Sequence, residues 1–120
     1  MIIYRNEVSH RWQRQMLLRA FHEGKIPRDN LCDADFLLLA AARHHGHPVE
    51  RPCPVCGRDS LHEVRWIYDE RLGRRSGTAR TEKEIAEIAK AVPYITVHLV
   101  EVCLHCQWNH LLTASLAEAA

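Results

Sequence analysis

The stretch Cys53-Pro-Val-Cys56-Gly57 and its later counterpart Cys103-Leu-His-Cys106 decide how the rest of the sequence is interpreted. A Cys-x-x-Cys turn places two thiolates on one side of the backbone, and two such turns complete the four-sulfur tetrahedron of a structural zinc site. The proline inside the first turn and the glycine after it suit a tight bend of the chain. We therefore expect Cys53, Cys56, Cys103 and Cys106 to bind one Zn²⁺.

Two other chemistries also use paired cysteines. A thioredoxin-like redox motif needs an exposed thiol at a helix start in a βαβ setting, and neither pair has that context. An iron–sulfur cluster takes four cysteines as well, but two short pairs favour zinc. Four thiolates leave no open coordination position, so we expect a structural metal rather than a catalytic one. Gln107 follows the second pair where the first has glycine, which is a small departure from the pattern.

Hydrophobic periodicity predicts two helices in the N-terminal part of the chain. The first is expected to begin near Asn6 or Ser9 and to close at Gly24–Pro27, with one apolar face. That face comprises Val8, Trp12, Met16, Leu17, Ala20 and Phe21. The second begins at the N-cap Asp33 and runs through 36–45, apolar nearly all round. We expect these helices to form a pair that packs on the remainder of the protein.

The C-terminal part is expected to be a zinc ribbon of antiparallel strands with one inserted short helix. Strands are predicted over 62–70 and 94–102, and Thr81 with Glu84 has the form of a capping box that begins a helix. Residues 111–116 fit a third strand or a short terminal helix. The fold class is therefore α+β, with a helical segment at 1–48 and a zinc-ribbon domain at 49–120. Three prolines, Pro48, Pro52 and Pro54, mark the boundary between the two.

The distribution of charge suggests where an acidic partner would bind. Sixteen Lys and Arg against fifteen Asp and Glu give a net charge of +1, which excludes an argument from bulk charge for nucleic-acid binding. Two local groups of arginine stand out. Arg71, Arg74, Arg75 and Arg80 lie on a Gly-containing loop without acidic residues, and Arg11 and Arg14 lie on the polar face of the first helix. Arginine pairs with phosphate through two parallel hydrogen bonds, so both groups are candidate phosphate contacts, the loop as a mobile arm.

No stretch of the sequence approaches the about 18 apolar residues of a membrane-spanning helix. The first residues lack a basic region followed by an apolar core, so no signal peptide is predicted. We expect a cytoplasmic protein that does not associate with membranes. In that compartment five cysteines do not indicate disulfides, and the fifth, Cys32, is expected to be a buried small residue.

The string from Val100 to Leu111, with the second cysteine pair inside it, resembles a domain-of-unknown-function family of small actinobacterial zinc-ribbon proteins. Leu31-Cys-Asp-Ala-Asp35 carries the same resemblance, which covers nearly the whole chain. It implies a zinc ribbon and brings no activity with it. Zinc ribbons mostly serve transcription and translation, which implies a non-enzymatic adaptor for RNA, DNA, or a machine such as RNA polymerase or the ribosome. Two alternatives stay open: a Cys-x-x-Cys redox or other small enzyme, and a module that binds only proteins.

Overall fold

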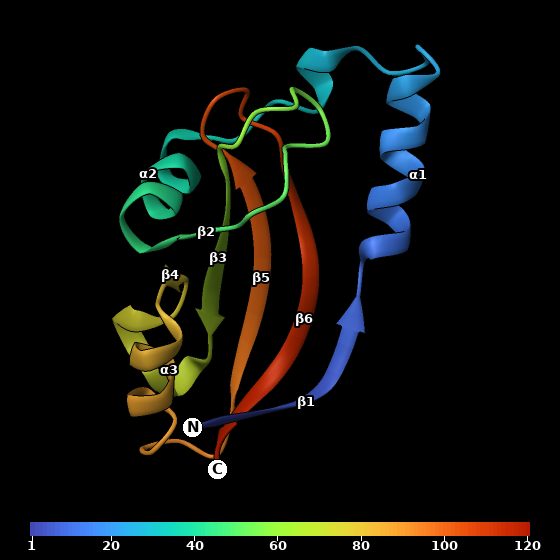
Figure 1. Ribbon diagram of the computed structural model, residues 1–120. Helices are drawn as coiled ribbons and strands as arrows, with labels where there is room; N and C mark the ends of the chain where they lie inside the picture. The colour runs from blue at the N-terminus through green and yellow to red at the C-terminus, as the bar shows by residue number, and fades with distance from the viewer.

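Apolar and β-branched residues in the second half of the chain form the centre of an antiparallel sheet, shown in the computed structural model of residues 1–120 (Figure 1). The sheet has six strands in the order β1-β6-β5-β3-β2, and β4 pairs separately with β3. The strands are β1 (Ile2–Ser9), β2 (His47–Pro48), β3 (Leu61–Tyr68), β4 (Thr78–Ala79), β5 (Ile95–Cys103) and β6 (Asn109–Ala119). The α+β class and the antiparallel strands are as predicted.

The three central strands fix the register on which the site depends. In the β3–β5 pair Leu61 lies opposite Cys103, and in the β5–β6 pair Val102 lies opposite Asn109. The second cysteine pair therefore forms the connection of the β5–β6 hairpin. The C-terminal segment, which fitted either strand or helix, is a strand because it pairs with β5 on one side and β1 on the other.

The first strand was not predicted. Residues 2–9 form β1, which pairs with β6, and the helix expected from Asn6 or Ser9 begins only at Arg11. The strand carries a bulge between Arg5 and Val8, where Asn6 has a left-handed φ of 53°. Ile2, Ile3 and Tyr4 favour a strand, and the pairing with β6 decides the conformation.

The three α-helices are α1 (Arg11–His22), α2 (Phe36–His45) and α3 (Glu82–Ile88), and short 3-10 turns lie at Arg28–Asn30 and Glu70–Arg75. The predicted helical pair is wrong. Helix α1 packs against β6, whereas α2 packs against β3 and β5, and the two lie apart in Figure 1. The N-cap of α2 is Asp35 rather than Asp33, because the Asp35 carboxylate accepts a hydrogen bond from the Leu38 amide at 2.8 Å. The capping box predicted at Thr81 and Glu84 is present.

The predicted apolar face of the first helix is only partly buried. Trp12 is 70% exposed and Met16 is also exposed, whereas Leu18 is buried. Only the second half of α1 contributes to the core, through Leu17, Leu18 and Phe21. The all-apolar second helix likewise leaves Phe36 and Leu37 exposed at its first turn.

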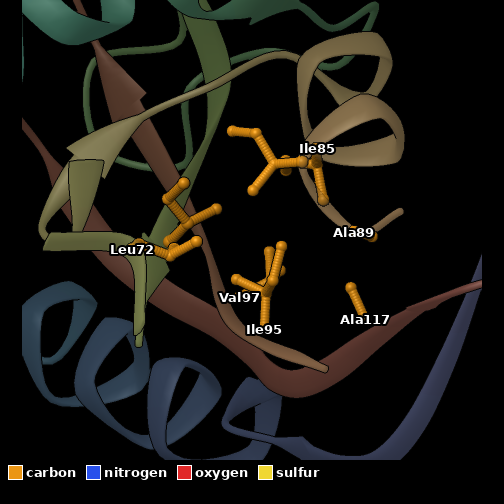
Figure 2. Packing of buried hydrophobic residues seen from close by; sticks show 8 residues of the cluster. Leu72, Ile85, Ala89, Ile95, Val97 and Ala117 are labelled. Atoms are coloured by element: carbon orange, nitrogen blue, oxygen red, sulfur yellow. The ribbon is translucent and has the colours of Figure 1, made fainter. Parts of the chain in front are cut away.

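Three apolar clusters hold the sheet and its helices together. The first lies under α3, where Ile85 and Ala89 pack on Ile95, Val97 and other residues of the sheet (Figure 2). The second surrounds the cysteines and includes Leu61 and Trp108. The third joins α2 to β3 and β5. The core is thus distributed along the sheet, with one cluster for each end and one for α2.

Strands β1 and β2 come from the segment 1–48 that was predicted to be helical, and both belong to the same sheet as the C-terminal strands. Residue 48 is the last residue of β2, so the predicted boundary falls where that strand ends. No helix of the protein combines the length and the apolarity needed to cross a bilayer.

Candidate metal centre

The fold brings the four predicted cysteines together. All four Sγ atoms lie within 4.8 Å of one another. The shortest separations join one turn to the other: 3.7 Å between Cys53 and Cys106, and 3.6 Å between Cys56 and Cys103. These distances are far above the about 2.05 Å of a disulfide, and all four thiols are free. The four residues are therefore placed to hold one metal ion.

The two cysteine turns have the same backbone geometry. In the first, the Gly57 amide donates to the Cys53 carbonyl at 2.9 Å, and in the second the Gln107 amide donates to the Cys103 carbonyl at 3.0 Å. The left-handed φ angles are 77° at Gly57 and 73° at Gln107. The departure from glycine in the second turn is thus absorbed by a glutamine that adopts the same conformation.

A second hydrogen bond repeats in both turns and points the first cysteine of each pair inward. The Cys53 amide donates to the Arg58 carbonyl at 2.9 Å, and the Cys103 amide donates to the Trp108 carbonyl at 2.8 Å. The Cys53 and Cys103 side chains are buried, whereas Cys56 and Cys106 are half-buried. One inner and one outer thiol from each turn make up the four-sulfur group.

Burial and hydrogen bonds act differently on the inner thiols. Burial raises the pKa of the Cys53 thiol to about 11. Burial also disfavours the Cys103 thiolate, but the Cys106 amide and the Ser60 hydroxyl, at 3.4 Å and 3.1 Å from its Sγ, outweigh it and lower the pKa of Cys103 to about 7. Burial likewise raises the pKa of Cys106. A cation among the sulfurs would stabilise the thiolate forms that burial disfavours.

Glu101, two residues before Cys103, is a buried carboxylate that the sequence pattern shows only as an isolated polar residue on a strand. Its side chain is 0% exposed. Oε2 accepts from Arg14 Nε at 2.6 Å and from Trp108 Nε1 at 2.7 Å, and Oε1 accepts from Arg51 Nη2 at 3.0 Å. Burial opposes ionisation, but these three donors outweigh it and lower the pKa of Glu101.

Through these bonds Glu101 connects separate parts of the site. Arg14 belongs to α1, Trp108 follows the second cysteine turn, and Arg51 precedes the first. Arg51 also donates to Glu63 at 2.9 Å. The signal in the sequence was the position of Glu101 on the same face of its strand as Val97 and Cys103, where a charged residue must find partners.

Half of the arginines predicted to meet a partner are engaged within the protein. Arg14 pairs with Glu101. Arg71 pairs with Asp69 at 2.6 Å, holds the pKa of that carboxyl at about 2, and lies 4.5 Å from the centre of the Tyr94 ring. Arg80 bonds to Thr78 at 3.0 Å and pairs with Glu84 at 3.4 Å. The side chains of these three arginines are therefore engaged in contacts within the protein.

The other three, Arg11, Arg74 and Arg75, are exposed and form no ion pair. The loop is attached to the rest of the protein at two points: Leu72 is buried in the cluster under α3, and the Thr78 hydroxyl donates to the Arg75 carbonyl at 2.6 Å. Arg74 and Arg75 end the 3-10 turn Glu70–Arg75, near α3, whereas Arg11 begins α1 (Figure 1). The two groups of arginine thus lie on separate parts of the surface.

Neighbouring residues lie around the sulfurs without joining them. Cys32 is half-buried rather than buried, and it packs against the apolar cluster of the cysteines. His110 stacks on Trp108 with ring centres 5.8 Å apart, and neither it nor His105 belongs to the four-residue group. The group that could hold a metal is therefore made of cysteines alone.

Comparison with known proteins supports the predicted resemblance and adds no activity. "Uncharacterized protein Rv0049" of Mycobacterium tuberculosis (strain ATCC 25618 / H37Rv) is 40% identical over 108 residues, which cover 90% of this chain and 79% of the relative. "Uncharacterized protein Mb0050" of Mycobacterium bovis matches with the same identity and coverage. No solved structure matches the chain. The expected relationship to an actinobacterial family is confirmed. A family model matches residues 1–119, and the chain therefore belongs to DUF5318, a family of unknown function.

Proposed function

We propose that the protein is a non-enzymatic zinc-ribbon adaptor of the cytoplasm, with Zn²⁺ held by Cys53, Cys56, Cys103 and Cys106. The spacing of the sulfurs carries the proposal. A tetrahedron of Zn–S bonds of about 2.3 Å has edges of about 3.8 Å. The two shortest separations between the turns, 3.7 and 3.6 Å, agree with that edge.

A zinc ion in this position would cross-link the first cysteine turn to the β5–β6 hairpin. Four thiolates fill its coordination shell, so no position is left for water or substrate and the ion would act through structure. The shared hydrogen bonds of the two turns support this role, since both direct their sulfurs to one point. The shortest separations join one turn to the other, whereas a redox Cys-x-x-Cys pairs the two cysteines of a single turn, which favours the metal over a redox dithiol.

The adaptor role rests on the free arginines. Arg74 and Arg75 project from a segment that Leu72 anchors in the core, so little backbone conformational entropy would be lost when they contact a partner. Exposed, unpaired guanidinium groups suit phosphate. We propose RNA, DNA, or a nucleic-acid-bound machine such as RNA polymerase or the ribosome as the partner, with Arg11 as a second point of contact.

Metal analysis and thiol titration test the zinc site. Protein purified without chelator is expected to contain one zinc per chain and four thiols protected from alkylation. Two readily alkylated thiols with no metal would instead support the redox alternative, and iron in place of zinc would contradict the metal assignment.

Binding to single-stranded RNA and duplex DNA over a range of salt concentrations tests the adaptor role. Arg74→Ala/Arg75→Ala is expected to reduce the slope of log K against log salt by about 1.4–1.8, the value for two lost phosphate contacts. Its unfolding free energy should change by less than about 0.5 kcal/mol, because both side chains are exposed. Arg19→Ala/Arg43→Ala removes two other exposed arginines and is the matched control. Salt-independent binding, or an unchanged slope in the Arg74/Arg75 variant, would contradict the proposal.

A pull-down from native lysate with and without nuclease separates the remaining possibilities. Capture of nucleic acid or of a nuclease-sensitive complex supports the proposed partner. Capture that is resistant to nuclease and insensitive to the Arg74/Arg75 variant would favour the alternative of a module that binds only proteins.

A further inference from the structure

A cavity of about 220 Å³ lies on the sheet face beside β1 and the start of α1, away from the cysteines. The register shows how its floor is built. Thr113 of β6 lies opposite Leu99 of β5, which in turn lies opposite Arg65 of β3. Ser115 lies opposite Val97 in a parallel row. Opposed residues of antiparallel strands share a face, so both rows point into the same space.

Two hydroxyl groups in this floor have no partner in the protein. Thr113 is 7% and Ser115 is 8% exposed, so each side chain is more than nine-tenths buried. Neither hydroxyl makes a hydrogen bond with another group of the protein, and no buried polar atom is sealed off without a partner. Both hydroxyls therefore face the open cavity. Because both hydroxyls are open to the cavity, a ligand that enters it meets two neighbouring hydrogen-bond donors.

The walls of the cavity carry both positive and negative side chains. Arg65 on one side has a side chain that is 24% exposed, and Arg11 forms the rim on the α1 side. Two carboxylates lie near these cations: Glu7 at the rim, and Glu82, which pairs with Arg65 at 3.3 Å and accepts from the Tyr4 hydroxyl at 3.0 Å. Arg65 keeps further donors on its guanidinium after that pairing, and Arg11 has no ion pair. Apolar Val97 and Leu99 complete the floor.

We propose that this cavity binds a small organic anion that carries a carboxylate or phosphate group. The oxyanion accepts hydrogen bonds from the Thr113 and Ser115 hydroxyls and from Arg65, and the apolar part of the ligand lies over Leu99. The volume is below the roughly 300–1,000 Å³ of sites for drug-sized ligands, so the ligand is the size of a small metabolite. This site requires neither Arg74 nor Arg75; it shares only the rim residue Arg11 with the proposed adaptor surface.

Two bulges adjoin this part of the sheet. The β1–β6 register shifts between Arg5 and Val8, opposite Ser115, and the β5–β6 register shifts between Leu99 and Val100. Bulges bend a strand and turn side chains, and they are common beside binding sites. They account for a hollow at this point of an otherwise regular sheet.

The experiment is a titration of the ¹⁵N-labelled, metal-loaded protein, followed by amide chemical shifts. Inorganic phosphate and butyrate are the two probes, and sodium chloride at matched ionic strength is the reference. Saturable shifts centred on residues 97–99 and 113–115 are expected with at least one probe. Saturation by phosphate alone identifies a phosphate-bearing ligand, and saturation by butyrate alone identifies a carboxylate.

Variants assign the binding to the hydroxyls. Thr113→Val and Ser115→Ala are each expected to weaken binding about tenfold, as for loss of one hydrogen bond to a charged group. Thr96→Val, on the other face of β5, is the matched control and should stay within about twofold of the parent protein. If Thr113→Val does not fold, Ser115→Ala alone decides. Shifts that match those caused by chloride, that centre on exposed arginines elsewhere, or that persist unchanged in Ser115→Ala would overturn the proposal.

Discussion

The two cysteine turns make the same backbone hydrogen bonds, but the chain holds them in different ways. The second turn joins β5 to β6, and strand pairing begins on both sides of it at Val102 and Asn109. The first lies within residues 49–60, between β2 and β3, where the chain has no helix or strand. One turn is therefore a hairpin connection, and the other is a loop.

Apart from the packing of Cys53 and Val55 in the cluster around the cysteines, few contacts position the first turn. The Leu104 amide donates to the Ser60 carbonyl at 3.0 Å, the Val49 amide donates to the Leu61 carbonyl at 3.1 Å, and Arg51 reaches Glu101. Arg51 and Glu101 occupy equivalent positions, each two residues before the first cysteine of its turn. We therefore expect the sheet to place the second turn without metal, whereas the first turn should depend more on a bound metal and on this ion pair.

Removal of the metal should have the largest effect and should separate the two turns. A structural zinc contributes about 10–16 kcal/mol in small zinc fingers, which unfold without it. Here a six-stranded sheet and two apolar clusters lie outside the cysteine group, so we expect the sheet to stay folded when the metal is removed. After chelation we expect the ratio of the Gly57 to the Gln107 amide exchange rate to rise about 100-fold. This corresponds to a change of about 2.7 kcal/mol in the relative opening free energies of the two turns. Hydrogen exchange measured by NMR compares these matched amides directly, since both donate to the carbonyl of the first cysteine in their turn.

Equal loss of protection at the two amides would show that the hairpin also depends on the metal. Protection retained at both would show that the loop contacts suffice. Cys106→Ser gives a second route to the same state, because it removes one ligand without a chelator.

Loss of the charge on Glu101 should come next. Glu101→Gln keeps an acceptor for Trp108 but removes the buried counter-charge of Arg14 and Arg51, although Arg51 keeps its pair with Glu63. Breaking a fully buried ion pair costs about 3–5 kcal/mol. Because the remaining Arg14 and Arg51 side chains are 20% and 42% exposed and can be hydrated, we expect a smaller loss, about 1–3 kcal/mol, in urea unfolding of the metal-loaded protein. The first turn should loosen more than the second, because only Arg51 connects it to Glu101.

The control is Glu118→Gln, which breaks the exposed pair with Arg5 and should cost less than about 1 kcal/mol. A Glu101 variant as stable as this control would mean that Glu101 does not support the site. It would also mean that the ion pair with Arg51 does not hold the first turn in place.

The metal ligands could be predicted from the sequence because their chemistry is local. A Cys-x-x-Cys turn brings two sulfurs together whatever the rest of the chain does, and the second pair lies directly after a strand. The capping box at Thr81 was predictable for the same reason, since its two hydrogen bonds join residues three apart.

The remaining features depend on residues distant in the sequence. Strand β1 exists because Ile2 and Ser9 find partners more than a hundred residues later, at Ala119 and Thr113. Trp12 is exposed because only the later turns of α1 reach the core, which the periodicity of the helix itself does not reveal. The partners of Glu101 likewise come from three separate segments. Local pattern therefore predicted the elements better than their packing.

Exchange of the residues at the left-handed position should have the smallest effect and gives the finest comparison of the turns. Gly57→Gln gives the first turn the residue of the second, and Gln107→Gly does the reverse. A left-handed conformation costs a non-glycine residue about 1–2 kcal/mol, and nothing lies within 4 Å of a Cβ at Gly57, so Gly57→Gln should lose about 1 kcal/mol from backbone conformation alone. Gln107→Gly should gain a few tenths of a kcal/mol, because the added freedom of glycine in the unfolded chain offsets about 0.5–1 kcal/mol of the relief.

Gly24→Gln, at a φ of 76° beyond the end of α1, measures the same backbone cost far from the metal. Urea unfolding with zinc bound compares the three. A loss at Gly57 well above that at Gly24 would mean that strain in the first turn is passed on to the metal, as expected for a loop that the metal holds. A larger change at Gln107 than at Gly57 would reverse the order of the two turns.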